Sequence, residues 1–186
     1  MARVAEPTRR VLGPEFFDRP ALAVARGLIG KFLVRRRDGA EAALMLTETE
    51  AYDGPNDKAS HAWRGRTARN TPMFGPPGTI YVYFTYGMHW MLNLVCRQAD
   101  YPAAVLIRGA GAVVGPARLT KALGIDRGLN DRRLGVETGL WVEDRGVAVR
   151  PRDIERTPRI GIDYAGDYVD KPWRFVVRKK ARAGLL

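Results

Sequence analysis

The first fifty residues alternate between apolar stretches and turn signals, and this pattern predicts a helix followed by a β-hairpin. The helix is expected to run from Asp18-Arg19-Pro20, with the aspartate as its cap and the proline in its first turn, to Gly30. Residues 31–37 and 41–52 are then predicted as two strands on either side of the tight turn Asp38-Gly39.

One face of the second strand changes character along its length. Because alternate residues of a strand share a face, the pattern places on one side Leu44, Leu46, Glu48, Glu50 and Tyr52. Carboxylates two positions apart on a strand are separated by roughly 6.5 to 7 Å, close to the spacing in glycosidases that invert their substrate. Glu-x-Glu is also common at solvated strand ends, so the motif alone leaves a structural role open.

Residues 53–78 are rich in residues that interrupt helices and strands: Asp53-Gly54-Pro55, Arg69-Asn70-Thr71-Pro72 and Gly75-Pro76-Pro77-Gly78. This density predicts a long loop, and long loops in compact domains are usually functional or disordered. Disordered segments are poor in aromatic residues, whereas this segment holds His61, Trp63 and Phe74. We therefore expect an ordered and functional loop.

The rest of the chain predicts more strands and one more helix. Strands are expected at 79–84 and 90–96, joined by a turn at Tyr86-Gly87-Met88-His89. The other expected elements are a strand at 104–108, a helix from Gly115-Pro116 to Leu123 closed by Gly124, a hairpin over 141–150 around Asp144-Arg145-Gly146, and a strand at 173–177 before a basic tail.

Together these elements predict a mixed α/β (α+β) fold. The 186 residues, 46% of them hydrophobic, suffice for one domain with a sizeable core. We expect a single domain over 1–186 with a curved antiparallel β-sheet, surrounding helices and a protruding β-hairpin. Residues 1–13 and 180–186 are expected to be flexible.

The charge of the chain indicates the kind of partner. Thirty-one Lys and Arg against 20 Asp and Glu give a net charge of +11, which favours a polyanion, with nucleic acid first. An anionic membrane surface or an acidic protein would also be attracted. No apolar stretch is long enough for a signal segment or a membrane span, so a soluble, cytoplasmic protein without a membrane partner is expected.

Metal-binding side chains are scarce. Cys96, the single cysteine, lies in an apolar run and is predicted to be buried and unreactive. The only histidines are His61 and His89, so a structural zinc site has few ligands. We expect neither a metal nor a cofactor.

Aromatic residues are concentrated in the predicted hairpin of residues 79–96. Tyr81 and Tyr83 share one strand face, and aromatic strands usually fill a core. Tyr86, in contrast, lies at the predicted tip, where an exposed aromatic side chain can enter a DNA minor groove and unstack a base step.

Several segments together closely resemble the alkyladenine (3-methyladenine) DNA glycosylases of the mammalian methylpurine type. The segments are Glu48-Thr49-Glu50-Ala51-Tyr52, Arg69-Asn70-Thr71-Pro72-Met73-Phe74, Pro77-Gly78-Thr79-Ile80-Tyr81-Val82-Tyr83 and Tyr86-Gly87-Met88. The likeness extends from Gly27-Leu28-Ile29-Gly30 to Pro158-Arg159-Ile160-Gly161 and Lys171-Pro172-Trp173-Arg174-Phe175, nearly the whole chain.

The resemblance implies a role for each matching residue. Glu50 is similar to the catalytic base that holds the attacking water, with Arg108 and the backbone carbonyl of Ile160 as the other partners. The residues implied in the base pocket are Tyr52, His61 and Tyr83 as stacking walls, Tyr81 as the support of His61, Asn93 as the screen against guanine-like bases, and Leu106 on the strand leading to Arg108.

The hairpin tip resembles the part of the family that inserts into DNA. Tyr86 matches the wedge that fills the gap left by a flipped base, and Met88 lies beside it. His89 departs from the family, which has another aromatic residue at this position.

The implied function is that of a monofunctional DNA glycosylase of base excision repair, acting as a monomer associated with the nucleoid. It would flip alkylated or deaminated purines (3-methyladenine, 7-methylguanine, hypoxanthine, ethenoadenine) out of duplex DNA and hydrolyse the N-glycosidic bond without cleaving the strand. Two alternatives stay open: a nonenzymatic nucleic-acid-binding domain, and a carbohydrate hydrolase that uses Glu48 and Glu50. The second leaves the charge of +11 unexplained.

Overall fold

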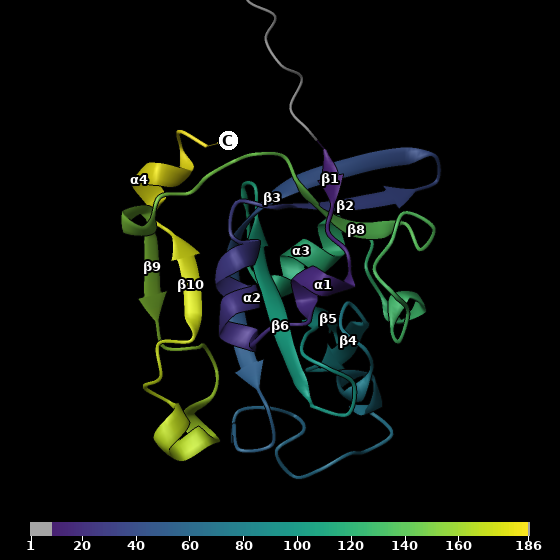
Figure 1. The fold of residues 1–186 in the computed structure, drawn as a ribbon, viewed down its shortest axis with the longest axis vertical. Coiled ribbons are helices and arrows are strands. Elements are labelled where there is room, and N and C mark those ends of the chain that lie inside the picture. The colour runs from purple at the N-terminus through teal and green to yellow at the C-terminus, as the bar shows by residue number, and fades with distance from the viewer. Residues whose placement is uncertain (1–8, 186) are drawn as a thin grey trace, which may run out of the picture.

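A single long strand, β3 (Ala40–Asp53), organises the sheet in the computed structural model, which describes residues 9–185. The described strands form a ten-stranded sheet in which all pairings are antiparallel. Mixed α/β architecture on an antiparallel sheet is thus confirmed (Figure 1). Residues 1–8 and 186, part of the termini predicted to be flexible, lie outside the described residues.

The strand order places the central strands between two smaller groups. The main path is β1-β8-β2-β3-β6-β5-β4, with β7 paired to β6, and β10 paired to β3 and to β9. The other strands are β1 (Arg10–Val11), β2 (Phe32–Arg37), β4 (Ile80–Thr85), β5 (His89–Val95), β6 (Ala103–Ala110), β7 (Val113–Val114), β8 (Leu140–Asp144), β9 (Ile154–Thr157) and β10 (Arg174–Val177). Figure 1 shows β9 and β10 beside the central strands, continuing the sheet beyond β3.

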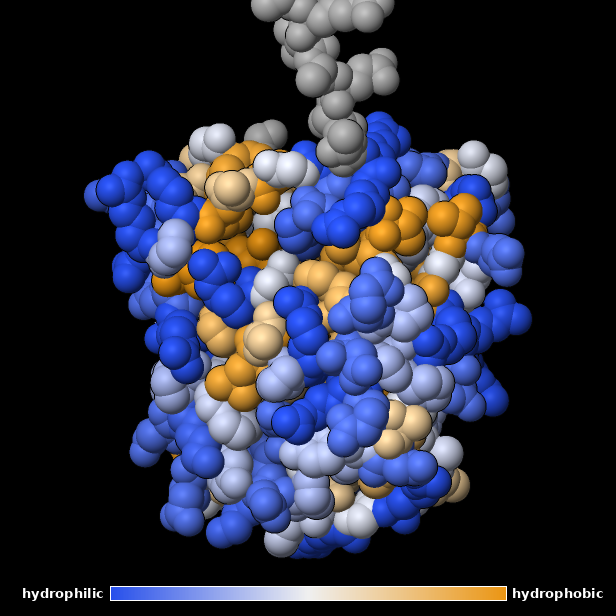
Figure 2. Space-filling view, in the orientation of Figure 1, coloured by the Kyte–Doolittle hydropathy of each residue, from blue (hydrophilic) through white to orange (hydrophobic). Residues whose placement is uncertain are grey.

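The helices are short and pack mainly on one face of the central strands. They are α1 (Pro14–Phe17), α2 (Ala21–Leu28), α3 (Pro116–Ala122) and α4 (Lys179–Arg182), with 3₁₀ turns η1 (Thr71–Phe74), η2 (Arg127–Leu129), η3 (Pro151–Asp153) and η4 (Asp163–Tyr168). Val24 of α2 and Leu119 of α3 are fully buried in one core with Val105 and Ile107 of β6. The opposite face of β4, β5 and β6 is therefore free of these helices. Hydrophilic residues dominate the molecular face drawn in Figure 2.

The prediction that alternate residues of β3 share one face from Leu44 to Tyr52 is wrong, because the strand is irregular. Leu46 is buried in the helix-side core, and the Thr49 hydroxyl donates to the Ala25 carbonyl of α2. Glu48 and Glu50 instead both contact Arg108 on the other face. The register against β6 shifts between Leu46 and Glu48 and shifts back between Glu48 and Thr49, and an extra residue at such a point moves the alternation by one position. Leu44 and Leu46 therefore do not share a face with the two glutamates and Tyr52.

Two local predictions are wrong. Asp18 ends α1, with its N–H bonded to the Pro14 carbonyl, and the cap position of α2 is Pro20, which has no side chain donor or acceptor. The predicted hairpin over 141–150 does not form, because β8 ends at Asp144 and pairs with β1 and β2. The following residues turn away toward Gly30, whose added Cβ would lie 2.9 Å from Val149.

The described parts of the termini carry secondary structure. β1, within the predicted flexible segment 1–13, pairs with β8. The basic tail begins with α4, which extends into the predicted flexible segment 180–186. Both segments therefore contribute elements to the fold as described.

The predicted loop 53–78 is ordered by internal hydrogen bonds: the Asn70 side chain donates to the His61 and Gly65 carbonyls.

We predict that Gly109→Ala destabilises the protein. Gly109 lies opposite the shifted segment of β3, and an added Cβ would come within 3.2 Å of the Glu48 Cβ and 3.3 Å of the Val113 carbonyl. Overpacking of this kind costs about 1–3 kcal/mol, which urea denaturation measures. Gly135→Ala is the control, since nothing lies within 4 Å of its added Cβ. Equal stabilities of the two variants would contradict close packing at the bulge.

Candidate active site

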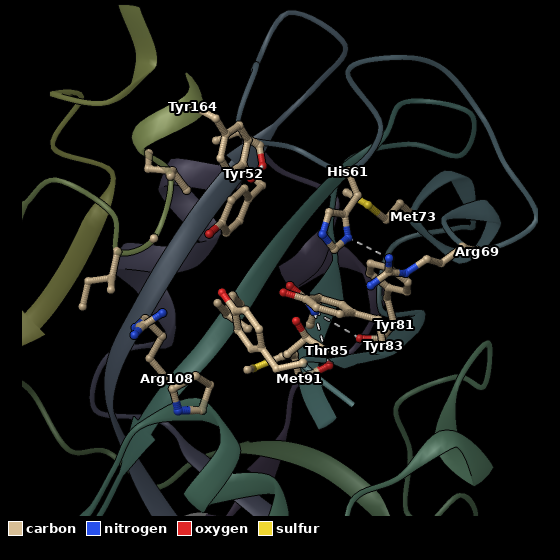
Figure 3. A pocket seen from close by; sticks show the side chains of 18 residues that line it. Tyr52, His61, Arg69, Met73, Tyr81, Tyr83, Thr85, Met91, Arg108 and Tyr164 are labelled. Carbon is tan, nitrogen blue, oxygen red and sulfur yellow. Dashed lines mark hydrogen bonds between the residues drawn. The ribbon is translucent and has the colours of Figure 1, made fainter. Parts of the chain in front are cut away.

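A pocket of about 420 Å³ opens on the sheet face opposite α2 and α3. Its walls come from β3 through β6 and the turn between β4 and β5, from Pro116 at the start of α3, from loop residues between 59 and 73, and from residues 160–164 (Figure 3). The volume lies within the range of small-molecule sites. Segments that are far apart in the sequence thus meet around one cavity.

Glu50 lies directly behind the pocket wall. Its side chain has no exposed surface. Oε1 accepts the Ile160 backbone N–H at 2.9 Å, and Oε2 accepts the Tyr52 hydroxyl at 3.0 Å and Arg108 Nη1 at 3.4 Å. These three contacting residues all line the pocket. The contact of Ile160 is made by its N–H, whereas the resemblance implied its carbonyl as a partner of the water.

Opposing effects act on the pKa of Glu50. Burial raises it above the usual value, while Arg108, the Ile160 N–H and the Tyr52 hydroxyl lower it. A carboxylate that accepts donors is stabilised in its charged form, and desolvation favours the protonated form. The result is a carboxylate with greater proton affinity than one in water, as a general base requires.

Glu48 lies next to this site without lining the pocket. Its Oε1 accepts Arg108 Nε at 3.1 Å and Arg174 Nε at 2.8 Å. The two glutamates are therefore joined through Arg108 rather than facing each other across an open gap. Arg174 was not predicted as a site residue.

His61, Tyr81 and Tyr83 form an aromatic wall. The Tyr81 hydroxyl lies 3.0 Å from His61 Nδ1, and the His61 and Tyr83 rings meet edge to face with centroids 4.5 Å apart. Loss of water around the ring, together with Arg69, lowers the pKa of His61 to about 4, so the imidazole is neutral at pH 7. Burial raises the pKa of Tyr81, and its retained proton can be donated to Nδ1, which leaves the imidazole proton on Nε2.

Asn93 and Leu106 lie side by side in the pocket. They are directly paired across β5 and β6 and are both buried. Asn93 Nδ2 donates to the Tyr81 carbonyl at 3.3 Å and to the Met91 carbonyl at 3.4 Å. These bonds fix the orientation of the amide.

The turn between β4 and β5 presents the predicted intercalating residues. Tyr86 and Gly87 have φ of +52° and +66°, and the Met88 N–H bonds to the Thr85 carbonyl, as in the primed turns of hairpins. The side chains at the tip are exposed, 82% for Tyr86 and 67% for Met88. Tyr86 also lines the pocket, so the hairpin tip and the pocket are adjacent.

The sequence profile of the methylpurine-DNA glycosylase family matches residues 15–114 and 110–181. This chain belongs to that family. A relative named "Putative 3-methyladenine DNA glycosylase" from Methanocella arvoryzae is 46% identical over 89% of this chain and 91% of its own length. The mouse protein named "DNA-3-methyladenine glycosylase" is 38% identical over 90% of this chain and 59% of its own length.

As a methylpurine-DNA glycosylase, the chain is an N-glycosyl hydrolase of DNA repair whose substrate is DNA. The family therefore favours this function over a nonenzymatic binding domain and over a carbohydrate hydrolase. No helix within residues 9–185 is long and apolar enough to cross a membrane. The same residues contain no group of three or more potential metal ligands.

A buried ion pair that the sequence patterns do not predict lies next to the glycosylase pocket. Arg159 donates to both Asp57 carboxylate oxygens, at 2.6 and 2.8 Å, and to the Ala51 carbonyl at 2.9 Å. Neither side chain is exposed. The Arg159 guanidinium also lies 4.7 Å from the centre of the Tyr52 ring. The pair therefore ties the loop after β3 to the segment that supplies Ile160.

Two further residues of the glycosylase pocket were also missed. Arg69 lies 5.5 Å from the centre of the Tyr83 ring and donates to the Phe84 carbonyl. Tyr164 lines the pocket from the other side, and its hydroxyl donates to the Ala59 carbonyl at 3.3 Å. The segment around Arg69 is part of the family resemblance, but the contacts of Arg69 with Tyr83 and Phe84 leave no pattern in the local sequence.

We predict that Arg159→Met greatly destabilises the glycosylase. The substitution leaves Asp57 as a buried charge without its partner, which costs about 3–5 kcal/mol. Urea denaturation at neutral pH gives the free energy of unfolding. Lys58→Gln is the control, because Lys58 and Asp167 are exposed and 4.0 Å apart, and such a pair contributes less than about 1 kcal/mol. A small effect of Arg159→Met would show that the pair is dispensable.

Proposed function

We propose that this glycosylase rotates a damaged purine out of duplex DNA into the pocket of Figure 3 and that Glu50 activates the water that replaces it. The observation that carries the proposal is the placement of Glu50: its side chain has no exposed surface, and its hydrogen-bond partners within residues 9–185 are three residues of the pocket wall, Tyr52, Arg108 and Ile160. The product is an abasic site in an uncut strand.

In the proposed reaction, water forms a bond to C1′ of the deoxyribose as the bond from C1′ to the purine nitrogen breaks. The sugar becomes positively charged in the transition state, and the Glu50 carboxylate stabilises this charge. The water proton passes to Glu50. Within the described residues Oε1 accepts only the Ile160 N–H, and a carboxylate oxygen can accept a second bond. We therefore assign the water to Oε1.

The leaving base determines whether a proton is needed. A purine that is already cationic, such as 3-methyladenine or 7-methylguanine, leaves as a neutral molecule. Hypoxanthine or ethenoadenine leaves well only after a ring nitrogen is protonated. Both classes share the requirement for an ionised Glu50.

Selectivity is proposed to arise from unstacking and from the pocket. Damaged or mismatched bases cost less to unstack. Tyr52, Tyr83 and the neutral His61 offer aromatic faces to the purine, and the fixed amide of Asn93 would clash with the 2-amino group of guanine. The proposed partner is therefore duplex DNA with damaged purines, bound by a monomer whose net charge of +11 attracts the phosphates.

We predict that Glu50→Gln abolishes base release and keeps lesion binding. The amide retains the shape of the side chain but neither takes up the water proton nor stabilises the sugar cation. Single-turnover excision and a binding titration on the same duplex separate the two effects. Glu41→Gln, on the exposed end of the same strand, is the matched control. Substantial release by Glu50→Gln would assign the catalytic base elsewhere.

We predict that Tyr86→Ala weakens the flipped state. The side chain would no longer fill the hole in the base stack. Alanine retains the Cβ at the positive φ of +52°, so the change removes the ring without relaxing the backbone as glycine would. A fluorescent base analogue in the duplex reports unstacking, with the exposed Val136→Ala as control. An unchanged signal would make Tyr86 an ordinary turn residue.

A further inference from the structure

Arg108 lies between two buried carboxylates. Its Nε donates to Glu48 at 3.1 Å, and its Nη1 reaches Glu50 only at 3.4 Å. Glu48 in turn accepts Arg174 Nε at 2.8 Å, while Arg174 Nη1 donates to the Thr157 hydroxyl at 2.9 Å. The shorter bonds from the two arginines to carboxylates are thus those to Glu48, not the one to Glu50.

We infer that Glu48 and Arg174 act together as positioning residues for Arg108. They hold its guanidinium so that a single nitrogen faces Glu50 at long range, instead of pairing with that carboxylate through two nitrogens. This inference rests on the proposed function of Glu50 as the base. A guanidinium fork paired with both carboxylate oxygens would be the stronger contact, but it would occupy the oxygen that the water needs.

Arg174 contacts Glu48 diagonally across the strand pair β3 and β10. Arg174 of β10 is directly opposite Glu50 of β3, yet its Nε bonds to Glu48. Room for Glu48 comes from Gly109, whose added Cβ would be 3.2 Å from the Glu48 Cβ. The register shift at this point also brings Arg108 to the face of both glutamates. The backbone therefore favours this arrangement of four charged side chains.

The two glutamates and two arginines balance in charge. Both arginines lower the pKa of Glu50. Without the charge of Glu48, two cations would face one carboxylate, and Arg108 would be free to move onto it. Glu50 would then hold a proton less strongly and would be a weaker base. Without Arg174, one of the two cations that favour ionised Glu50 would be lost.

Other groups around Glu50 are unchanged by these substitutions. From the elements packed around it they are Tyr52 of β3, Tyr83 of β4, the Ile160 N–H, and Arg159 next to that amide. Burial raises the pKa of Tyr83 to about 12 and also raises that of Tyr52. Both hydroxyls therefore keep their protons near neutral pH. His61, whose pKa is about 4, also titrates in acid, but it is present in every variant, so the differences between their acid limbs report Glu50.

The test compares single-turnover pH profiles on a duplex with 3-methyladenine, a cationic base that lacks a 2-amino group and leaves without protonation. Activity falls in acid as Glu50 becomes protonated. Glu48→Gln should lower the maximal rate and move this acid limb to lower pH. Arg174→Gln should move it to higher pH. Each shift is expected to be on the order of one pH unit, as for the loss of a neighbouring charge.

Charge-preserving variants separate positioning from packing. Arg174→Lys keeps the cation without the planar fork, so its acid limb should stay at the wild-type pH while its maximal rate falls. If Glu48→Gln does not fold, a shift of the acid limb in Arg174→Gln that is absent in Arg174→Lys would support the inference. Shifts in the same direction for Glu48→Gln and Arg174→Gln, or a uniform loss of rate without shifts, would overturn the inference. Failure of the proposed function is distinct, because Glu50→Gln would then remain active.

Discussion

The Glu50 carboxyl group has no exposed surface, and the pocket supplies the contacts that stabilise its charged form against burial. Desolvation of a carboxylate is costly unless donors and cations replace the lost water. Three donors do so here, from β3, from β6 and from the segment after β9. Each donor requires its own element to be correctly placed. The carboxylate therefore couples the geometry of the central strands to that of a loop more than a hundred residues later in the chain.

The sheet allows this coupling because its two faces contact different kinds of side chain. One face of the central strands packs against α2 and α3 and supplies most of the apolar core. The other face is left for polar and aromatic side chains, which contact each other rather than a second layer of helices. A rigid support lies beneath the pocket, and the loop walls are fixed by hydrogen bonds and by the Asp57–Arg159 pair. Such support is what a site that positions water and base requires.

Much of this arrangement could be predicted from local patterns. The hairpin of β2 and β3, the meander of β4 to β6 and the exposed Tyr86 all follow from alternation and turn residues. The resemblance pointed to Glu50 and Arg108, which the structure brings into contact. The face change in β3 was missed, because a bulge adds a residue without any change in composition. Arg159, Arg174 and Asp57 were missed because their partners are distant in the chain, and one sequence does not show pairings at such separation.

The bulge between Leu46 and Thr49 has a consequence for how this strand can evolve. Substitutions along β3 change one side chain at a time, and neighbouring groups can adjust to many of them. Leu46 pairs with Ala110 and Thr49 with Ile107, so the two strands have the same number of residues between these pairs, and deletion of one residue here would put the two parts of β3 out of register with β6. The contacts of Glu48 and Glu50 with Arg108, which lies in the matching segment of β6, would then be displaced. The length of this segment is therefore more constrained than its composition, and insertions or deletions should be confined to the turns at either end of the strand.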